Sequence, residues 1–339
     1  MNSTTEKREA WLDVAKFLGI FCIYLGHYGA AAGKAYEFVF RFHVPLFFFL
    51  SGCSSNFDQE TSVIRFIYKR FKRIMIPFYC FAALSIGING IVHNNLTGGL
   101  FEQIKIVAKG CIRNSFCNPS LWFLSCLFVT ESVFKLLKKV RNRCLILAIT
   151  VVLFVISECA MDPRPIVQPH FWYNMDSMLY YIVFYALGYL TFRYISLFFK
   201  KSTGRKSIAL QSIFFALCLY AALLFDNRSL FVASNRVTSM LISVLQPCLL
   251  ILFTLMVSWF LSGIPYFSKV GQETLYLCGN EWVIKTIAPF VLEAVGLQVN
   301  ISTPLTAYLM TFGLIALNYK YVIPFEKLAV RAILQKMSV

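Results

Sequence analysis

The feature that most constrains the fold of this chain is a series of apolar runs, each close to twenty residues long. Runs of this length cross the hydrocarbon core of a bilayer as α-helices. Mean hydropathy is +0.66 and only 14% of the residues are charged, which is too apolar for a soluble globular domain. Ten candidate helices can be placed, at residues 10–32, 36–54, 74–92, 120–137, 144–160, 176–199, 208–225, 237–262, 271–293 and 303–322. The sequence therefore predicts an all-α, polytopic membrane protein with about ten transmembrane helices, which forms a single domain over residues 1–339.

Basic residues are concentrated on one side of this predicted arrangement. If the ten helices alternate in direction, 22 of the 32 Lys and Arg residues lie in one set of flanks and 7 in the opposite set. Loops rich in Lys and Arg stay in the cytoplasm, so both termini are expected to be cytoplasmic. Topology and contact with the lipid bilayer thereby explain the net charge of +16, and no nucleic-acid partner is expected. The 11 cysteines lack the spacing of metal ligands, so no metal site is predicted.

Two ionisable residues share one face of the first predicted helix. Lys16 and His27 are eleven residues apart, which corresponds to three helical turns plus roughly 20° and about 16 Å along the axis. Ionisable groups at membrane depth are costly and usually belong to a functional site. A neutral histidine is a ready general base, so His27 is a candidate for proton chemistry and Lys16 a candidate cation for an anionic ligand. Asp13 lies three residues before Lys16, and a simple salt bridge between the two is the alternative interpretation.

A second polar cluster lies in the next predicted helix, in the segment FRFHVPLFFFLSG. Arg41 and His43 are two residues apart and precede Pro45, which frees backbone groups. This pattern indicates a polar cavity rather than a helix that faces lipid. Glu37 is one turn before Arg41, where it can pair with that arginine or orient an imidazole.

Four segments in the first 128 residues resemble acyltransferase family 3, namely WLDVAKFLGIFCIYLGH, FHVPLFFFLSG, RFKRIMIPFY and LWFLSCLF. This family consists of multi-span membrane proteins that transfer acyl groups, mostly acetyl, to hydroxyls of sugars and other cell-surface molecules. The spacing of Lys16 and His27 matches the family's motif of a basic residue, ten further residues and a histidine. The resemblance is specific over residues 8–125 and weaker beyond them, where the ten-span topology is the main agreement.

The resemblance implies roles for individual residues. His27 corresponds to the essential catalytic histidine of the family, and Lys16 corresponds to the basic residue that engages the acyl-CoA donor. Arg70 and Arg73 would lie at the cytoplasmic mouth near the phosphates of CoA, and the alternative is that both are plain topological anchors. Trp122 corresponds to the aromatic residue of the family's WF motif.

The chain departs from the family pattern late in its sequence. Relatives often carry a histidine after an apolar run such as LYLCG, whereas this chain has Asn280 followed by Glu281. No second catalytic histidine is therefore assigned. Glu281 and Lys285 have the i,i+4 spacing of an ion pair within one helix and are interpreted as structural.

Taken with the resemblance, these residues predict an O-acetyltransferase in the inner membrane of a bacterium. Cations at the inner face suit the phosphates of cytoplasmic acetyl-CoA, the donor substrate, and His27 would deprotonate an acceptor hydroxyl that attacks the thioester. The resemblance implies that the acceptor is a surface polysaccharide or its lipid-linked precursor, and no permanently bound cofactor is expected. Candidates for stabilising the oxyanion are Arg41, His43 and Trp122, with Asp13 and Glu37 as further supporting residues. A transporter or flippase for a sugar or an organic acid is the alternative function, since it would use the same intramembrane charges.

Overall fold

The computed structural model describes residues 9–55, 62–93, 98–201, 205–224, 236–298 and 300–336. Every regular element in these residues is helical, as the apolar runs predict. The α-helices are α1 (Ala10–Gly26), α2 (Lys34–Phe40), α3 (His43–Cys53), α4 (Val63–Arg70), α5 (Ile76–His93), α6 (Gly99–Ala108), α7 (Leu121–Leu137), α8 (Arg143–Cys159), α9 (Met175–Lys201), α10 (Arg205–Leu224), α12 (Arg236–Leu261), α13 (Pro265–Gly271), α14 (Thr274–Ala294), α15 (Pro304–Leu317) and α16 (Ile323–Lys336). Two short 3₁₀ segments (Gly29–Ala32, Trp172–Asn174) and two π-helical segments (Phe71–Met75, Asn318–Val322) complete the set.

Three helices in the described residues are long and apolar enough to cross a membrane. They are Val63–Val92, which joins α4 to α5, Trp172–Lys201, which contains α9, and Arg236–Leu261, which is α12. The helix Ile208–Leu224 is apolar but shorter. The arrangement of ten spans with cytoplasmic termini stays a prediction.

The single helix predicted at 36–54 is wrong, because the structure divides it into α2 and α3. Phe42 leaves helical geometry, with φ −143° and ψ −16°. The imidazole Nδ1–H of His43 donates to the carbonyl of Val39 at 2.7 Å, which in an unbroken helix would accept from the backbone N–H of residue 43. Pro45 then falls in the first turn of α3, where its missing N–H leaves no helical hydrogen bond unmade. The break therefore places the polar cluster of this segment at the junction between two helices.

The predicted bounds of the first and last helices also differ from the structure. Helix α1 ends at Gly26, and a separate 3₁₀ turn follows before Gly33, whose φ of +59° favours glycine. The last helix continues from α15 through a π-helical segment into α16. Pro324 lies two residues after that segment and lacks the N–H that a regular helix needs, so the local hydrogen bonds shift to the wider π pattern.

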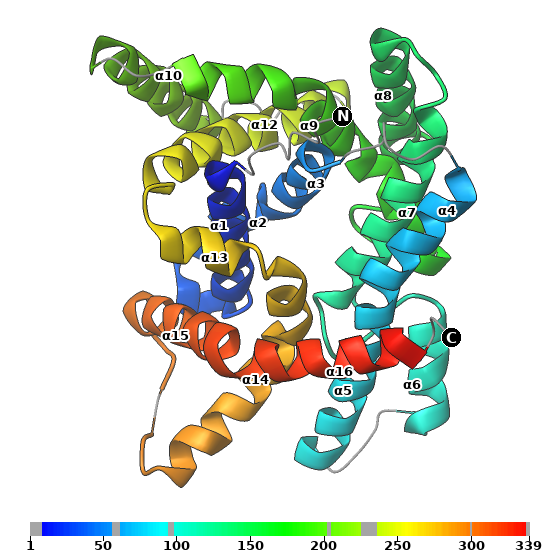
Figure 1. Ribbon diagram of the computed structural model, residues 1–339, viewed down its shortest axis with the longest axis vertical. Helices are drawn as coiled ribbons and strands as arrows, with labels where there is room; N and C mark the ends of the chain where they lie inside the picture. Colours follow the sequence, from blue (N-terminus) through cyan, green and yellow to red (C-terminus); the bar gives the residue numbers. More distant parts are fainter. Residues whose placement is uncertain are drawn as a thin grey trace.

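Helix α1 lies near the middle of the molecule, with α2 and α3 beside it and α13 to α15 below it in the view of Figure 1. It contacts α3, α12, α13, α14 and α15. Helix α13 approaches closely because position 271 is glycine, where a Cβ would lie 1.8 Å from the carbonyl oxygen of Asp13. Helices α3 and α9 meet in the same way at Gly52 and Gly188. Small residues let helices in a membrane approach each other, so the helix that carries the two main predicted site residues is held from several sides.

Candidate active site

His27 follows the last residue of α1 and contacts a carboxylate from α14. Its Nδ1 atom lies 2.8 Å from Oε2 of Glu281, although the two residues are 254 positions apart in the chain. The side chain of Glu281 is 1% exposed and that of His27 is 21% exposed. A carboxylate accepts a hydrogen bond from a nitrogen that carries a proton, so Nδ1 bears the hydrogen, and in the neutral imidazole Nε2 has the lone pair of a base.

Glu281 has further partners that hold it behind His27. Nζ of Lys285 lies 2.8 Å from Oε1 of Glu281, which confirms the predicted ion pair within α14. The hydroxyl of Ser120 donates to Oε2 at 3.3 Å. The ammonium of Lys285 also donates to the carbonyl of Tyr24 and lies 3.9 Å from the ring centroid of Tyr28. A buried carboxylate is costly unless it is paired and hydrogen-bonded, and here both conditions are met.

A cavity of about 380 Å³ lies beside His27 and is called the outer cavity, after the predicted topology. Three residues predicted to support catalysis line it together with His27, namely Arg41, His43 and Trp122. Glu37 is not one of its lining residues. That side chain is 80% exposed and lies 3.9 Å from Arg41, so the pairing alternative for Glu37 is confirmed.

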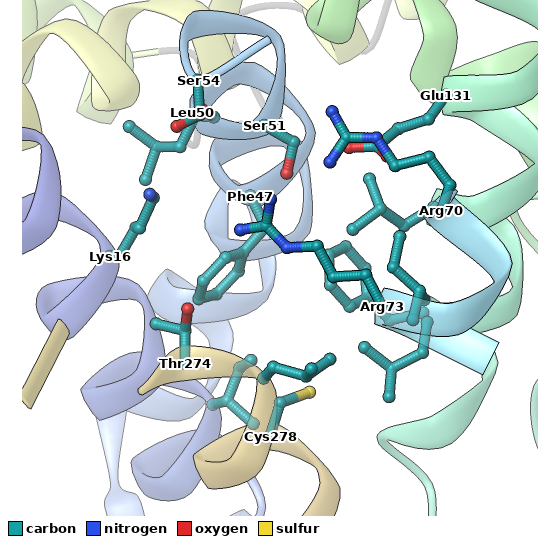
Figure 2. A pocket seen from close by; sticks show the side chains of 16 residues that line it. Lys16, Phe47, Leu50, Ser51, Ser54, Arg70, Arg73, Glu131, Thr274 and Cys278 are labelled. Atoms are coloured by element: carbon teal, nitrogen blue, oxygen red, sulfur yellow. The ribbon is translucent and has the colours of Figure 1, made fainter. Parts of the chain in front are cut away.

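A second cavity, of about 150 Å³, contains all three cations predicted to bind the donor and is called the inner cavity (Figure 2). Lys16 reaches it from α1, whereas Arg70 and Arg73 reach it from the junction of α4 with the π-helical segment. Figure 2 shows Lys16 and Arg73 extending into this space from opposite sides. Its lining also includes the hydroxyl side chains Ser51, Ser54 and Thr274. The tertiary structure thus gathers cations from distant parts of the sequence around one space.

Carboxylates hold two of these cations. Nε of Arg70 lies 3.0 Å from Oε2 of Glu131, and both side chains are largely buried. Asp13 lies 3.7 Å from Nζ of Lys16 and accepts a hydrogen bond from Gln272 at 3.2 Å. The predicted Asp13–Lys16 pair is therefore present, while Lys16 also faces the inner cavity.

The local backbone explains how Arg70 and Arg73 come to face the same cavity. Helix α4 ends at Arg70, and the π-helical segment Phe71–Met75 follows. Pro77 has no N–H for the carbonyl of Arg73, and the N–H of Ile76 bonds the carbonyl five residues before it. Such π-helical insertions change the direction of side chains and frequently occur at functional sites.

The two cavities are adjacent, because four mainly apolar side chains belong to the lining of each. Ile23, Phe47, Phe123 and Cys278 line both of them, and this group is called the neck. Lys16 lies on the inner side of the neck and His27 on the outer side, about 16 Å apart along a regular helix. The molecule therefore has cations on one side of these shared apolar side chains and His27 on the other.

Two carboxylates have roles that the sequence alone does not reveal. Glu281 has Lys285 as a partner on its own helix, so the sequence gives no reason to expect its contact with His27. Glu131 has Lys135 four residues later on its own predicted helix, whereas the structure pairs it with Arg70 from another helix. The one available signal is that Glu281 follows the position at which relatives carry a histidine. No group of three or more His, Cys, Asp or Glu suited to a metal ion occurs within the described ranges.

Comparison with known protein families agrees with this geometry. Residues 9–292 match the model of a family described as an acyltransferase domain. The matched segment contains every residue named above around the two cavities. No curated protein and no solved structure matches the chain.

Proposed function

The chain belongs to this acyltransferase family, and on that premise we propose that it transfers an acetyl group from cytoplasmic acetyl-CoA to a hydroxyl group. The hydroxyl belongs to a surface polysaccharide or its lipid-linked precursor, and the reaction takes place at the inner membrane of a bacterium. One observation carries the proposal. The cations line the inner cavity, and His27, which Glu281 contacts, lines the adjacent outer cavity on the other side of the neck.

The inner cavity supports a role in binding the donor. CoA carries several phosphate charges, and Lys16, Arg70 and Arg73 surround the inner cavity with positive charge. Arginine recognises phosphate oxygens with a planar fork, whereas lysine acts as a point charge. An extended phosphopantetheine arm is comparable in length to the three helical turns between Lys16 and His27, so it would reach through the neck.

The outer cavity supports the chemistry. Nε2 of His27 takes the proton of the acceptor hydroxyl while that oxygen forms a bond to the thioester carbonyl carbon. The tetrahedral intermediate then loses its C–S bond, and CoA leaves as a thiolate that takes the proton back from the imidazolium. Glu281 stabilises the imidazolium between these two steps, because its charge lies 2.8 Å from Nδ1. The lining residues with hydrogens to donate to the oxyanion include Arg41 and Trp122.

Donor binding distinguishes this function from that of a transporter or flippase. We expect Lys16→Ala and Arg73→Ala each to raise the dissociation constant for acetyl-CoA about tenfold or more, because hydrogen bonds to charged groups contribute about 1.5–3 kcal/mol. Isothermal titration of the purified protein measures this constant. Lys72→Ala is the matched control, since the ammonium of Lys72 lies over the ring of Tyr68 at 4.6 Å and this residue does not line the inner cavity.

Arg70 needs a paired design. Arg70→Ala alone leaves the buried Glu131 without its cation, so the variant Arg70→Ala/Glu131→Gln separates donor binding from folding. If acetyl-CoA binds the Lys16, Arg73 and paired variants as tightly as it binds the wild type, the donor assignment fails, and a transporter becomes the better interpretation.

The acceptor is tested on cells. Deleting the gene should remove acetyl groups from a surface polysaccharide or its lipid-linked precursor, because in the proposed function this enzyme adds them. Mass spectrometry of the purified polysaccharide measures the acetyl content. The wild-type gene should restore it and the His27→Ala gene should not. Unchanged acetylation in the deletion strain would exclude these acceptors.

A further inference from the structure

On the basis of the proposed function, we infer that the outer cavity contains an anion subsite centred on Arg113, with Arg41 as its second cation, and that the acceptor carries a carboxylate or phosphate near the acetylated hydroxyl. This subsite is separate from the donor-binding cations, because neither arginine lines the inner cavity.

The charge balance of the outer cavity favours an anion. Its lining includes two arginines and two histidines and, among the described residues, no Asp or Glu. Two carboxylates that contact lining residues lie outside that lining and are already engaged. Glu281 is bound to His27 and Lys285, and Glu37, which pairs with Arg41, has a side chain that is 80% exposed.

Among the residues that the structure describes, neutral groups hold the side chain of Arg113. Its Nη2 atom donates to the carbonyls of Pro165 and Ile166, both at 2.7 Å. Its guanidinium lies 4.9 Å from the ring centroid of Trp122. No carboxylate lies within 4.0 Å of it in the described part of the chain. These contacts fix the orientation of the guanidinium and leave its positive charge without a counter-ion.

The loops that carry Arg113 are strained and tightly connected. Four residues other than glycine have positive φ there, namely Cys111, Asn114, Tyr173 and Asn174. A residue other than glycine in this backbone conformation destabilises the fold. It persists where surrounding contacts hold the backbone in place, often at ligand sites. The side chain of Asn174 provides that constraint, because it accepts from the backbone N–H of Arg113 at 3.0 Å and donates to Ser125 at 3.0 Å.

The geometry defines the chemistry of the ligand. Nη2 of Arg113 uses both of its hydrogens on the carbonyls of Pro165 and Ile166, so an oxygen of a carboxylate or phosphate would accept a charge-assisted hydrogen bond from Nη1 or Nε. The carboxylate of an acidic sugar and the phosphate of a lipid-linked sugar share this chemistry. An acceptor anchored at Arg113 would have its hydroxyls inside the cavity that His27 also lines. The subsite would therefore select acidic over neutral acceptors.

The test uses the full-length protein with CoA present, so that the donor-binding cations are occupied. Diethylpyrocarbonate modifies the free nitrogen of His27, and the rate is followed by mass spectrometry of the peptide that contains it. The probes are D-glucuronate, D-glucose 1-phosphate and D-glucose at equal ionic strength. We expect an anionic probe to slow the modification and D-glucose to have no effect. In Arg113→Gln the concentration needed for protection should rise about tenfold or more.

Further variants make the outcome decisive. Arg113→Lys keeps the charge and loses the planar guanidinium that the two carbonyls orient, so protection should be intermediate, and Arg41→Gln should weaken it as well. Arg164→Gln is the control, because Arg164 pairs with Glu158 at 3.2 Å and does not line the outer cavity. Protection by glucuronate alone indicates a sugar acid, and protection by glucose 1-phosphate alone indicates a lipid-linked phosphate.

Three results would overturn the subsite: no protection by either anion, equal protection by D-glucose, or protection that is unchanged in both Arg113 variants. The experiment measures no acetyl transfer. A negative result therefore leaves the proposed acetyltransferase activity to its own tests with the Lys16 variant and the deletion strain.

Discussion

Replacing His27 with alanine should lower the rate of acetyl transfer by at least about 10²-fold, the lower end of what positioned proton transfer contributes. Acetyl-CoA binding should stay close to that of the wild type, because the cations of the inner cavity lie on the far side of the neck. Transfer is measured with labelled acetyl-CoA, and affinity by titration of the same preparation.

His27→Gln separates chemistry from structure. A glutamine amide can still donate a hydrogen bond to Glu281, so it preserves the contact between α1 and α14. It cannot accept a proton at neutral pH, so activity should remain as low as in the alanine variant. A folded and active His27→Gln enzyme would exclude the general-base mechanism.

The second large effect is expected at Glu281, which acts on the reaction through His27. In Glu281→Gln the amide can donate to Nδ1, which moves the imidazole hydrogen to Nε2 and removes the basic nitrogen from the outer cavity. The turnover number should fall about 10²-fold while the affinity for acetyl-CoA is unchanged. Both quantities come from steady-state kinetics and titration of the purified protein.

Folding must be controlled in this experiment. Glu281→Gln leaves the largely buried ammonium of Lys285 without its carboxylate, and breaking a buried pair costs roughly 3–5 kcal/mol. The double variant Glu281→Gln/Lys285→Met removes that unpaired charge and should recover thermal stability without recovering activity. Lys285→Met alone should retain most of the activity, because Glu281 still contacts His27. Near wild-type turnover in the folded double variant would show that Glu281 is only structural.

Local sequence pattern predicted the helical class and several helix positions well. The helix predicted at 120–137 is observed as Leu121–Leu137, and that predicted at 144–160 as Arg143–Cys159. The helix prediction from an apolar run fails where a polar side chain competes with the backbone for a carbonyl acceptor. At 36–54 the imidazole of His43 takes the carbonyl of Val39, and one predicted helix becomes two.

The candidate site divides in the same way. The sequence alone predicted that Lys16 lies on the first helix with His27 three turns further along it, and that Glu281 pairs with Lys285, because helical rise and i,i+4 spacing are local properties; the structure ends this helix one residue before His27.

Only the tertiary structure decided which helices face each other. It brought Glu281 to His27 across 254 residues, placed Arg73 opposite Lys16 around the inner cavity, and set Arg113 over Trp122 in the outer cavity. These contacts depend on how side chains of different helices interdigitate and on glycines that let backbones approach, such as Gly271 against α1. No periodicity within a single helix records that information, since each helix satisfies its own backbone hydrogen bonds whichever neighbour it meets.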